Sequence, residues 1–139
     1  MHSEFSWPVR IYYEDTDTGG VVFYANYLKF FERARTEWLR TAGINQSALA
    51  ASRGLIFIVK STTVDYHAPA RLDDELKVTV VVERLGRASV QFIQEAWRIT
   101  DQSKELLATG RIKVGCVDTG ALRPCAIPDE VIAKISNNG

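Results

Sequence analysis

The stretch that decides the fold is Asn26-Tyr27-Leu28-Lys29-Phe30-Phe31-Glu32-Arg33-Ala34-Arg35-Thr36-Glu37-Trp38-Leu39-Arg40-Thr41. Its spacing predicts a helix over residues 26–41, and Gly43 is placed to end it. At about 100° per residue, the apolar side chains cover roughly half of the helix circumference. They are Tyr27, Leu28, Phe30, Phe31, Ala34, Trp38 and Leu39, followed by Ala42. This arc is broader than the stripe of a helix on a flat sheet, so we expect a curved sheet that wraps one central helix.

Arg35 falls inside this apolar arc by the same arithmetic. A guanidinium buried there needs a carboxylate or carbonyl partner. The alternative is that the long side chain reaches past its neighbours and keeps its charge in water. We expect the opposite face to be solvated, and it carries Lys29, Glu32, Arg33, Thr36, Glu37 and Arg40.

Five other segments have strand character, namely residues 9–14, 56–66, 75–85, 89–100 and 106–117. In the first of them, Val9, Ile11 and Tyr13 share one side. A polar connection leads from the helix to the second segment, and Pro128 opens a short terminal helix. One strand, a long helix and then four strands predict an α+β fold with an antiparallel sheet. We expect one domain that spans residues 1–139.

Composition limits the function classes. The 17 Lys and Arg residues balance 17 Asp and Glu residues, which argues against a general nucleic-acid-binding protein with a clustered basic face. Two His, with His2 in the N-terminal tail, and two Cys nine residues apart give no spacing typical of a zinc site. No run of 18 apolar residues and no signal peptide is found, and few Cys fit a reducing compartment. We therefore expect a cytoplasmic protein without a membrane segment.

Candidate chemistry lies just before the helix, where Glu14, Asp15 and Asp17 fall within four positions. A helix N-terminus presents free backbone N–H groups and a partial positive charge. A carboxylate beside such groups is typical of a nucleophile or base next to an oxyanion hole. Gly19 and Gly20 let the backbone approach a substrate closely. The alternative is that Asp17 only accepts hydrogen bonds from the turn or the helix start.

The stretch VRIYYEDTDTGGVVFYANY of residues 9–27, followed by ERARTE at residues 32–37, strongly resembles the hotdog-fold acyl-CoA thioesterases. Within them it is most similar to the YbgC subfamily, the Tol–Pal-associated thioesterases, which are related to 4-hydroxybenzoyl-CoA thioesterase. The resemblance extends to DYHAPARLDD at residues 65–74 and CVD at residues 116–118, and so covers nearly the whole chain. It implies the hotdog fold, a curved antiparallel sheet wrapped around a long central helix.

The resemblance also implies a site. Asp17 matches the catalytic carboxylate, Gly20, Val21 and Val22 match the loop around the thioester, and the backbone N–H of Tyr24 corresponds to the oxyanion donor. Many relatives carry His where this chain has Tyr24. The candidate cations for the CoA phosphates are Lys60, Arg71, Arg84, Arg87 and Lys113. Arg87 matches a basic turn that meets the nucleotide in related enzymes, and Lys60 lies where the partner subunit borders the site.

Two mechanisms remain open at this point. Asp17 either attacks the thioester carbonyl to give a mixed anhydride or activates a water as general base. No cofactor and no metal are expected, because CoA is part of the substrate, and the absence of a G-x-S-x-G motif excludes a serine-triad thioesterase. Short-chain aliphatic acyl-CoA is the expected substrate, although aromatic acyl groups also occur in the family. Tyr24 and Phe57 are expected to limit the acyl pocket.

Other residues receive structural interpretations. The family's helix motif favours an internal ion pair between Glu32 and Arg35 over exposure of Arg35. We expect His67 to be structural, Cys116 to lie in the core and Cys125 to be an incidental loop thiol. Trp38 and Trp97 are expected to serve packing.

The family resemblance implies an assembly as well. Hotdog subunits pair edge to edge, which removes an exposed edge strand, and the active site then lies at the dimer interface. We expect a homotetramer, a dimer of such dimers. The alternative function is a scaffold or acyl-carrier-protein-binding protein of the cell-envelope or phospholipid-synthesis machinery. A thioesterase acting on acyl carrier protein rather than CoA is a further alternative.

Overall fold

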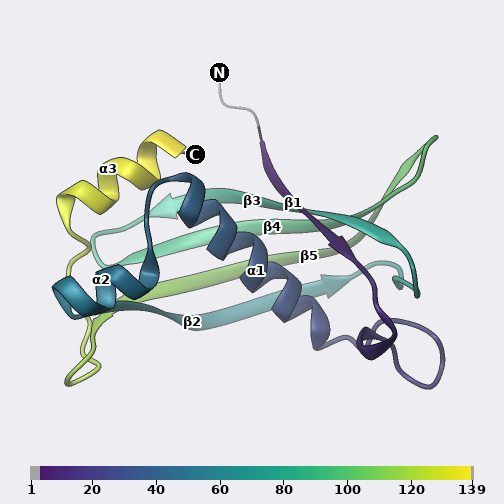
Figure 1. The fold of residues 1–139 in the computed structure, drawn as a ribbon, viewed down its shortest axis with the longest axis horizontal. Helices are drawn as coiled ribbons and strands as arrows, with labels where there is room; N and C mark the ends of the chain where they lie inside the picture. Colours follow the sequence, from purple (N-terminus) through teal and green to yellow (C-terminus); the bar gives the residue numbers. More distant parts are fainter. Residues whose placement is uncertain (1–3, 139) are drawn as a thin grey trace.

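A computed structural model describes residues 4–138 of the chain. Its strands form a five-stranded antiparallel sheet in the order β1-β3-β4-β5-β2 (Figure 1). The strands are β1 (Phe5–Arg10), β2 (Leu55–Tyr66), β3 (Glu75–Leu85), β4 (Ser89–Ile99) and β5 (Lys104–Asp118). The helices are α1 (Asn26–Thr41), α2 (Gln46–Arg53) and α3 (Asp129–Asn138). The expected α+β fold, with a curved antiparallel sheet around a central helix, is confirmed.

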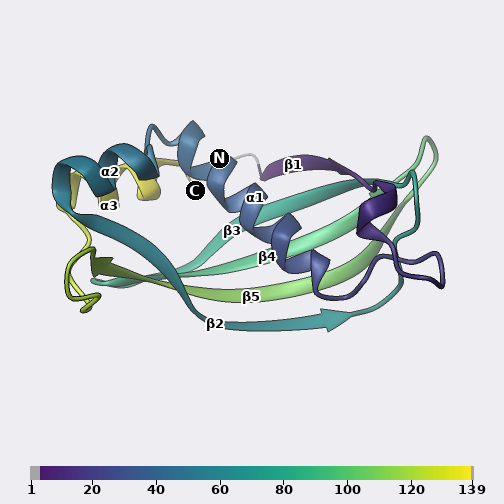
Figure 2. The same ribbon diagram turned by 60° about the horizontal axis from the view of Figure 1, so that its bottom comes forward.

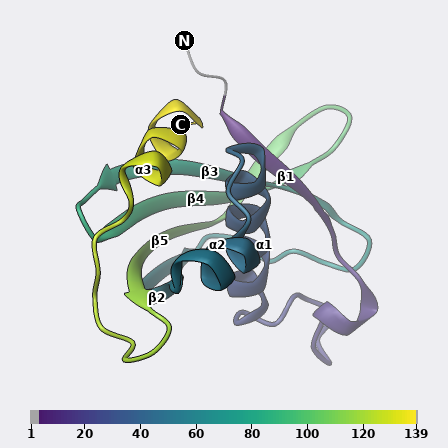
Figure 3. The ribbon, with the colours of Figure 1, turned by 60° about the vertical axis from the view of Figure 1, so that its left-hand side comes forward.

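The helix α1 has the predicted bounds and lies against the concave face of the sheet (Figures 2 and 3). Its buried residues are Tyr27, Phe30, Phe31, Ala34, Arg35, Trp38 and Leu39. The Trp38 ring meets the Phe92 ring of β4 edge to face, with centroids 5.5 Å apart. The prediction for Leu28 is wrong, because this side chain, in the first turn of the helix, is 44% exposed.

The sheet bends because three of its strand pairs contain irregularities, at Val59/Ser61, Val82/Arg84 and Ala96/Trp97. Close approach to α1 also requires a small residue on β5. A Cβ atom on Gly110 would lie 2.9 Å from a ring carbon of Phe31. The concave sheet thus buries the wide apolar arc of α1 that the sequence presents.

The first strand differs from its prediction. It begins at Phe5 and ends at Arg10, and a 3₁₀ turn follows at Tyr13–Asp15. The Asp15 carboxylate accepts a hydrogen bond from the Tyr12 N–H at 2.8 Å, which turns the chain away from the sheet. The Tyr13 side chain, expected beside Val9 and Ile11, is therefore 81% exposed. A local side-chain cap has overridden the alternating pattern.

A second helix, α2, occupies the stretch that we expected to be a polar connection. The Asn45 side chain accepts from the Ala48 N–H at 2.9 Å, and Gly54 ends the helix in the left-handed conformation. The cap residues, together with the alanines between them, were the signal that the prediction missed. The expected terminal helix is present as α3.

The sheet has two edges, β1 and β2. Along β2, residues 59–63 are all exposed, and Val59 has half of its surface accessible. Within residues 4–138, no helix is both long and apolar enough to cross a membrane. His2, which we expected in an N-terminal tail, lies outside the described residues.

Candidate active site

The Asp17 segment forms a small hairpin that leads into α1. The N–H of Asp17 donates to the Val21 carbonyl at 2.8 Å, and Thr16 pairs with Val22. The Phe23 N–H then donates to the Asp15 carbonyl at 3.0 Å. Gly20, with a φ of +81°, makes this reversal possible because few other residues adopt that conformation. The hairpin therefore places the Asp17 carboxylate close to the start of the helix.

The two carboxylate oxygens of Asp17 have different surroundings. Oδ1 accepts from the Gly19 N–H at 2.8 Å and from the Val21 N–H at 3.4 Å. Oδ2 has no hydrogen-bond partner among residues 4–138, and the side chain is exposed. The turn interpretation is thus correct for one oxygen only. These bonds fix the orientation of the carboxylate and leave the second oxygen accessible to a ligand.

The N-terminus of α1 offers backbone donors. Its first N–H groups, from Asn26 to Leu28, donate to carbonyl oxygens three residues earlier. The N–H groups of Tyr24 and Ala25 have no acceptor within the described part of the chain. Ala25 stands at the N-cap position and has no side chain that caps the helix. An anionic oxygen placed here would meet free donors and the positive end of the helix dipole.

Two tyrosines hold this helix start in place. The Tyr66 hydroxyl on β2 donates to the Tyr24 carbonyl at 3.0 Å, and the Tyr27 hydroxyl accepts from the Ala70 N–H at 3.1 Å. Burial raises the pKa of both hydroxyls, so both stay protonated near neutral pH. The Ala70 carbonyl in turn accepts from the Val22 N–H at 2.8 Å. Sequence reasoning missed Tyr66, because the hydrogen bond joins residues 42 positions apart.

The predicted loop residues differ in their surroundings. Val22 is buried in the core, whereas Val21 is half-buried and pairs with Arg71. Gly20 is exposed, and a Cβ atom there would meet nothing within 4 Å. The structure therefore assigns Val22 to the support of the loop and leaves Val21 and Gly20 on its accessible side.

The structure does not bring all the predicted cations together. Arg71 lies against the Asp17 hairpin through its pairing with Val21. Arg87, in the turn between β3 and β4, lies at the opposite end of the sheet in the same chain (Figures 1 and 2). Lys60 sits at the β2 irregularity and packs its alkyl chain over Gly115. One chain by itself therefore holds Arg71, but not Arg87, near Asp17.

The expected ion pair between Glu32 and Arg35 is not formed. Arg35 is only 8% exposed, so its side chain does not reach the surface, and its Nη1 donates to Gln94 Oε1 on β4 at 2.9 Å. The Glu32 carboxylate accepts instead from the Thr36 hydroxyl. Since Gln94 also donates to the carbonyls of Phe31 and Thr79, at 3.0 and 3.3 Å, its amide orientation is fixed. The partner of Arg35 is thus a neutral amide, which no spacing rule within the helix predicts.

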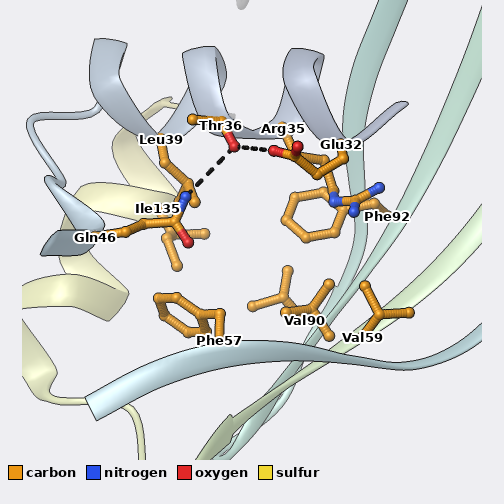
Figure 4. A pocket seen from close by; sticks show the side chains of 11 residues that line it. Glu32, Arg35, Thr36, Leu39, Gln46, Phe57, Val59, Val90, Phe92 and Ile135 are labelled. Carbon is orange, nitrogen blue, oxygen red and sulfur yellow. Dashed lines mark hydrogen bonds between the residues drawn. The ribbon is translucent and has the colours of Figure 1, made fainter. Parts of the chain in front are cut away.

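A cavity of about 250 Å³ lies between α1, the sheet, α2 and α3. Figure 4 shows its apolar lining, which includes Phe57, Val59, Val90 and Phe92, and the polar groups of α1 and α2 along one side. Phe57, which we expected from the sequence to limit an acyl pocket, lines this cavity. Tyr24 instead lines a separate hollow with Tyr27, Tyr66 and His67.

The remaining candidates have structural surroundings. His67 Nε2 lies 3.2 Å from the Thr109 hydroxyl, and Cys116 is buried with its sulfur 3.7 Å from that of Cys125. Trp38 is in the core, and Trp97 is half-buried under the Lys104 ammonium. In the described part of the chain, no group of three or more His, Cys, Asp or Glu residues could hold a metal ion.

Comparison with known proteins identifies a family that matches this chain and relatives whose activity is named. Residues 12–135 match the family described as the thioesterase-like superfamily. The chain is 48% identical over 133 residues to the acyl-CoA thioesterase YbgC of Haemophilus influenzae, which covers 96% of this chain and 95% of that one. It is 45% identical over 130 residues to the acyl-CoA thioester hydrolase YbgC of Escherichia coli, with 94% of each chain covered.

The fold also matches solved structures. A mutant of 4-hydroxybenzoyl-CoA thioesterase, crystallised with 4-hydroxybenzoyl-CoA, superposes with a TM-score of 0.89 and 19% sequence identity. The match covers 94% of this chain and 97% of the other. At this identity the likeness concerns the fold, and it agrees with the curved sheet and central helix described above.

Proposed function

Because the chain belongs to the thioesterase-like superfamily, and within it to the YbgC acyl-CoA thioesterases, we propose that Asp17 and the N-terminus of α1 form its catalytic centre. The chain is an acyl-CoA thioesterase, which releases a carboxylic acid and CoA. The single observation that supports the catalytic centre is that the hairpin leading into α1 leaves one oxygen of Asp17 accessible, while the N–H groups of Tyr24 and Ala25 at the helix start have no acceptor among the described residues.

The chemistry requires both parts of this centre. Attack on a thioester places negative charge on the carbonyl oxygen, and fixed backbone donors at a helix N-terminus stabilise that charge. The Tyr24 N–H is the proposed donor. Asp17 Oδ2 then acts either as the nucleophile that forms a mixed anhydride or as the base that takes a proton from the attacking water. Both routes require one carboxylate oxygen without an internal partner, and they end in the same products.

The proposal includes pairing of two copies along β2. This edge strand is long, and its exposed centre at residues 59–63 leaves backbone groups available to another chain. In a two-fold antiparallel pair centred on Ser61, Tyr66 of one copy would face Ile56 of the other. In each copy, Tyr66 holds Tyr24 of the same chain. The Tyr24 of one copy would then lie beside Phe57 and the cavity of the other. Each complete site thus combines the Asp17 hairpin of one copy with the cavity of the other.

The same pairing would bring cations of one copy toward Asp17 of the other. Arg87 lies far from Asp17 within one chain, and a partner in the opposite orientation would bring its β3–β4 turn toward the first chain's Asp17 end. We propose Lys60 and Arg87 as contacts for the CoA phosphates, with Arg71 as a further cation on the Asp17 side. Lys60 and Arg87 are exposed and form no ion pair with another described residue.

The cavity supports a small acyl group. Its volume of about 250 Å³ lies below the usual range of about 300–1,000 Å³ for ligand pockets. Since the bulky rings of Phe57 and Phe92 line it, short acyl groups fit the proposal better than long chains. We further propose that the enzyme works in the cytoplasm as a tetramer built from two β2-paired dimers.

The test is the replacement Asp17→Asn. We expect it to lower kcat for butyryl-CoA at least about 100-fold, because a neutral amide is neither an effective base nor a nucleophile. The melting temperature should change little, since the amide oxygen can still accept the two turn hydrogen bonds. Glu14→Gln is the matched control, because Glu14 is an exposed carboxylate in the same segment without a hydrogen bond to another described residue. Full activity of the Asp17→Asn protein would contradict the proposal.

A further inference from the structure

The cavity beside α1 contains a cation that the fold does not fully use. Arg35 lines it and is more than nine-tenths buried, and its one hydrogen bond goes to Gln94 Oε1. No carboxylate within residues 4–138 forms an ion pair with Arg35. A guanidinium has five N–H donors, so most of the donors of Arg35 lack a protein acceptor.

These free donors belong to a side chain that lines the cavity. No buried side-chain nitrogen or oxygen in the described part of the chain lacks a hydrogen-bond partner. The guanidinium nitrogens without an acceptor must therefore keep some accessible surface. Arg35 is part of the cavity lining, and Figure 4 shows the guanidinium extending from α1 beside Phe92.

The position of the guanidinium is held from behind. Gln94 is fully buried, and its amide nitrogen donates to the Phe31 and Thr79 carbonyls, so its oxygen can only face Arg35. Burial lowers the pKa of Arg35 to about 10, with the nearby Glu32 carboxylate opposing the shift, so the group remains cationic at neutral pH. The cavity thus has an apolar floor and a fixed, incompletely bonded cation in its wall.

We infer that this cavity binds an acyl group that ends in a carboxylate, with Arg35 as its anchor, so that the substrates include the CoA monothioesters of short dicarboxylic acids. This inference rests on the proposed function, which directs the acyl group past Phe57 into the cavity. A carboxylate matches the fork of guanidinium donors in geometry and in charge. A buried cation gains most from such a partner, because the apolar surroundings screen little.

Charge and size narrow the class further. The second charged group of the lining, Glu32, is exposed and already accepts a hydrogen bond from Thr36, so water screens its repulsion of an entering anion. The volume of about 250 Å³ lies just below the usual range of about 300–1,000 Å³ for ligand pockets. We therefore expect short acyl groups, of about four to six carbons, that carry a terminal carboxylate.

The experiment compares matched substrates on the full-length protein. Succinyl-, glutaryl- and adipyl-CoA are each paired with the unsubstituted acyl-CoA of the same carbon number, and kcat/KM is measured for every member. At the best chain length we expect the carboxylated member to be preferred about tenfold or more, the effect expected of hydrogen bonds to a charged group. Equal values, or a preference for the unsubstituted member at every length, would overturn the inference without the need for a variant.

Replacement of the anchor supplies the second arm. Arg35→Met should lower kcat/KM for the carboxylated substrate about tenfold to 100-fold and leave its unsubstituted counterpart within about threefold. Arg33→Met is the matched control, because Arg33 lies on the same helix, is exposed and does not line this cavity. Equal losses on both substrates would assign Arg35 to structure alone and contradict the inference. If Arg35→Met does not fold, Arg35→Lys keeps the cation without the fork and should weaken the preference.

The outcomes separate the two proposals. A protein that hydrolyses the unsubstituted series without any preference for a carboxylate contradicts this inference and leaves the proposed function intact. A protein that hydrolyses neither series contradicts the proposed function, and the inference with it.

Discussion

At Asp17, the observed structural task and the proposed chemical task fall to two different oxygens. Oδ1 accepts the N–H groups of Gly19 and Val21, and Oδ2 has no partner among the described residues. A carboxylate held by one oxygen loses little conformational entropy when the other reacts. The usual opposition between a turn-stabilising Asp and a catalytic Asp therefore does not apply here, because the hairpin uses only half of the group.

The two cysteines should differ in reactivity. Burial and the neighbouring Cys125 sulfur raise the pKa of Cys116 to about 12. The thiolate is the reactive form, and at pH 8 Cys116 is therefore almost entirely protonated. We expect iodoacetamide at pH 8 to modify the half-buried Cys125 first and Cys116 only after unfolding, as measured by peptide mass spectrometry.

The Cys125→Ser protein is the control, and it should show no rapid modification in the folded state. Modification of Cys116 as fast as that of Cys125 would contradict this account. It would mean that the end of β5 opens to solvent far more often than its buried position indicates.

Among the elements, α1 and β5 approach each other so closely that only glycine fits at one point of contact. A Cβ atom on Gly110 would lie 2.9 Å from a ring carbon of Phe31, which is fully buried and cannot move aside. We expect Gly110→Ala to lower the free energy of unfolding by about 1–3 kcal/mol through overpacking. The lower stability of the Gly110→Ala protein should appear as a decrease in its melting temperature.

Gly120→Ala is the matched substitution for this prediction. The nearest atom to a Cβ there is the Asp118 carboxylate at 3.6 Å, an ordinary contact. We expect the free energy of unfolding of this variant to stay within about 0.5 kcal/mol of the parent. Similar stabilities of the two variants would show that α1 adjusts its distance from the sheet.

In the whole molecule, the proposed pairing along β2 makes each site a product of two chains. Asp17→Asn removes the proposed catalytic group from one chain, and Val90→Phe is designed to fill the cavity of another. If the two parts belong to different chains of a pair, a mixed dimer regains one intact site of its two. Two inactive parents, unfolded and refolded together in equal amounts, should then recover about a quarter of the parent activity on hexanoyl-CoA.

Refolding each variant by itself is the control, and it should recover no activity. An absence of recovery in the mixture, with both variants folded and dimeric, would place Asp17 and the cavity of the same chain in one site. That result would contradict the arrangement across β2 while leaving the role of Asp17 open to its own test.

Much of the fold could be read from local patterns. The bounds of α1, the four long strands and the terminal helix follow from spacings that repeat within a few residues, and they agree with the structure. The errors were local as well. The caps at Asp15 and Asn45 turned the chain at places where alternation or polarity indicated something else.

The candidate site divides in the same way. Asp17, Gly20 and the helix start are neighbours in the chain, so the order of residues already placed a carboxylate beside free N–H groups. The partner of Arg35 is Gln94, 59 positions away, and the support of Tyr24 is Tyr66, 42 positions away. Helical periodicity put Arg35 among apolar neighbours, but only the curvature of the sheet decided that an amide, and not Glu32, would meet it. The amino-acid sequence alone determines which functional groups are neighbours along the chain. Contacts between distant segments depend on how the whole sheet closes around α1.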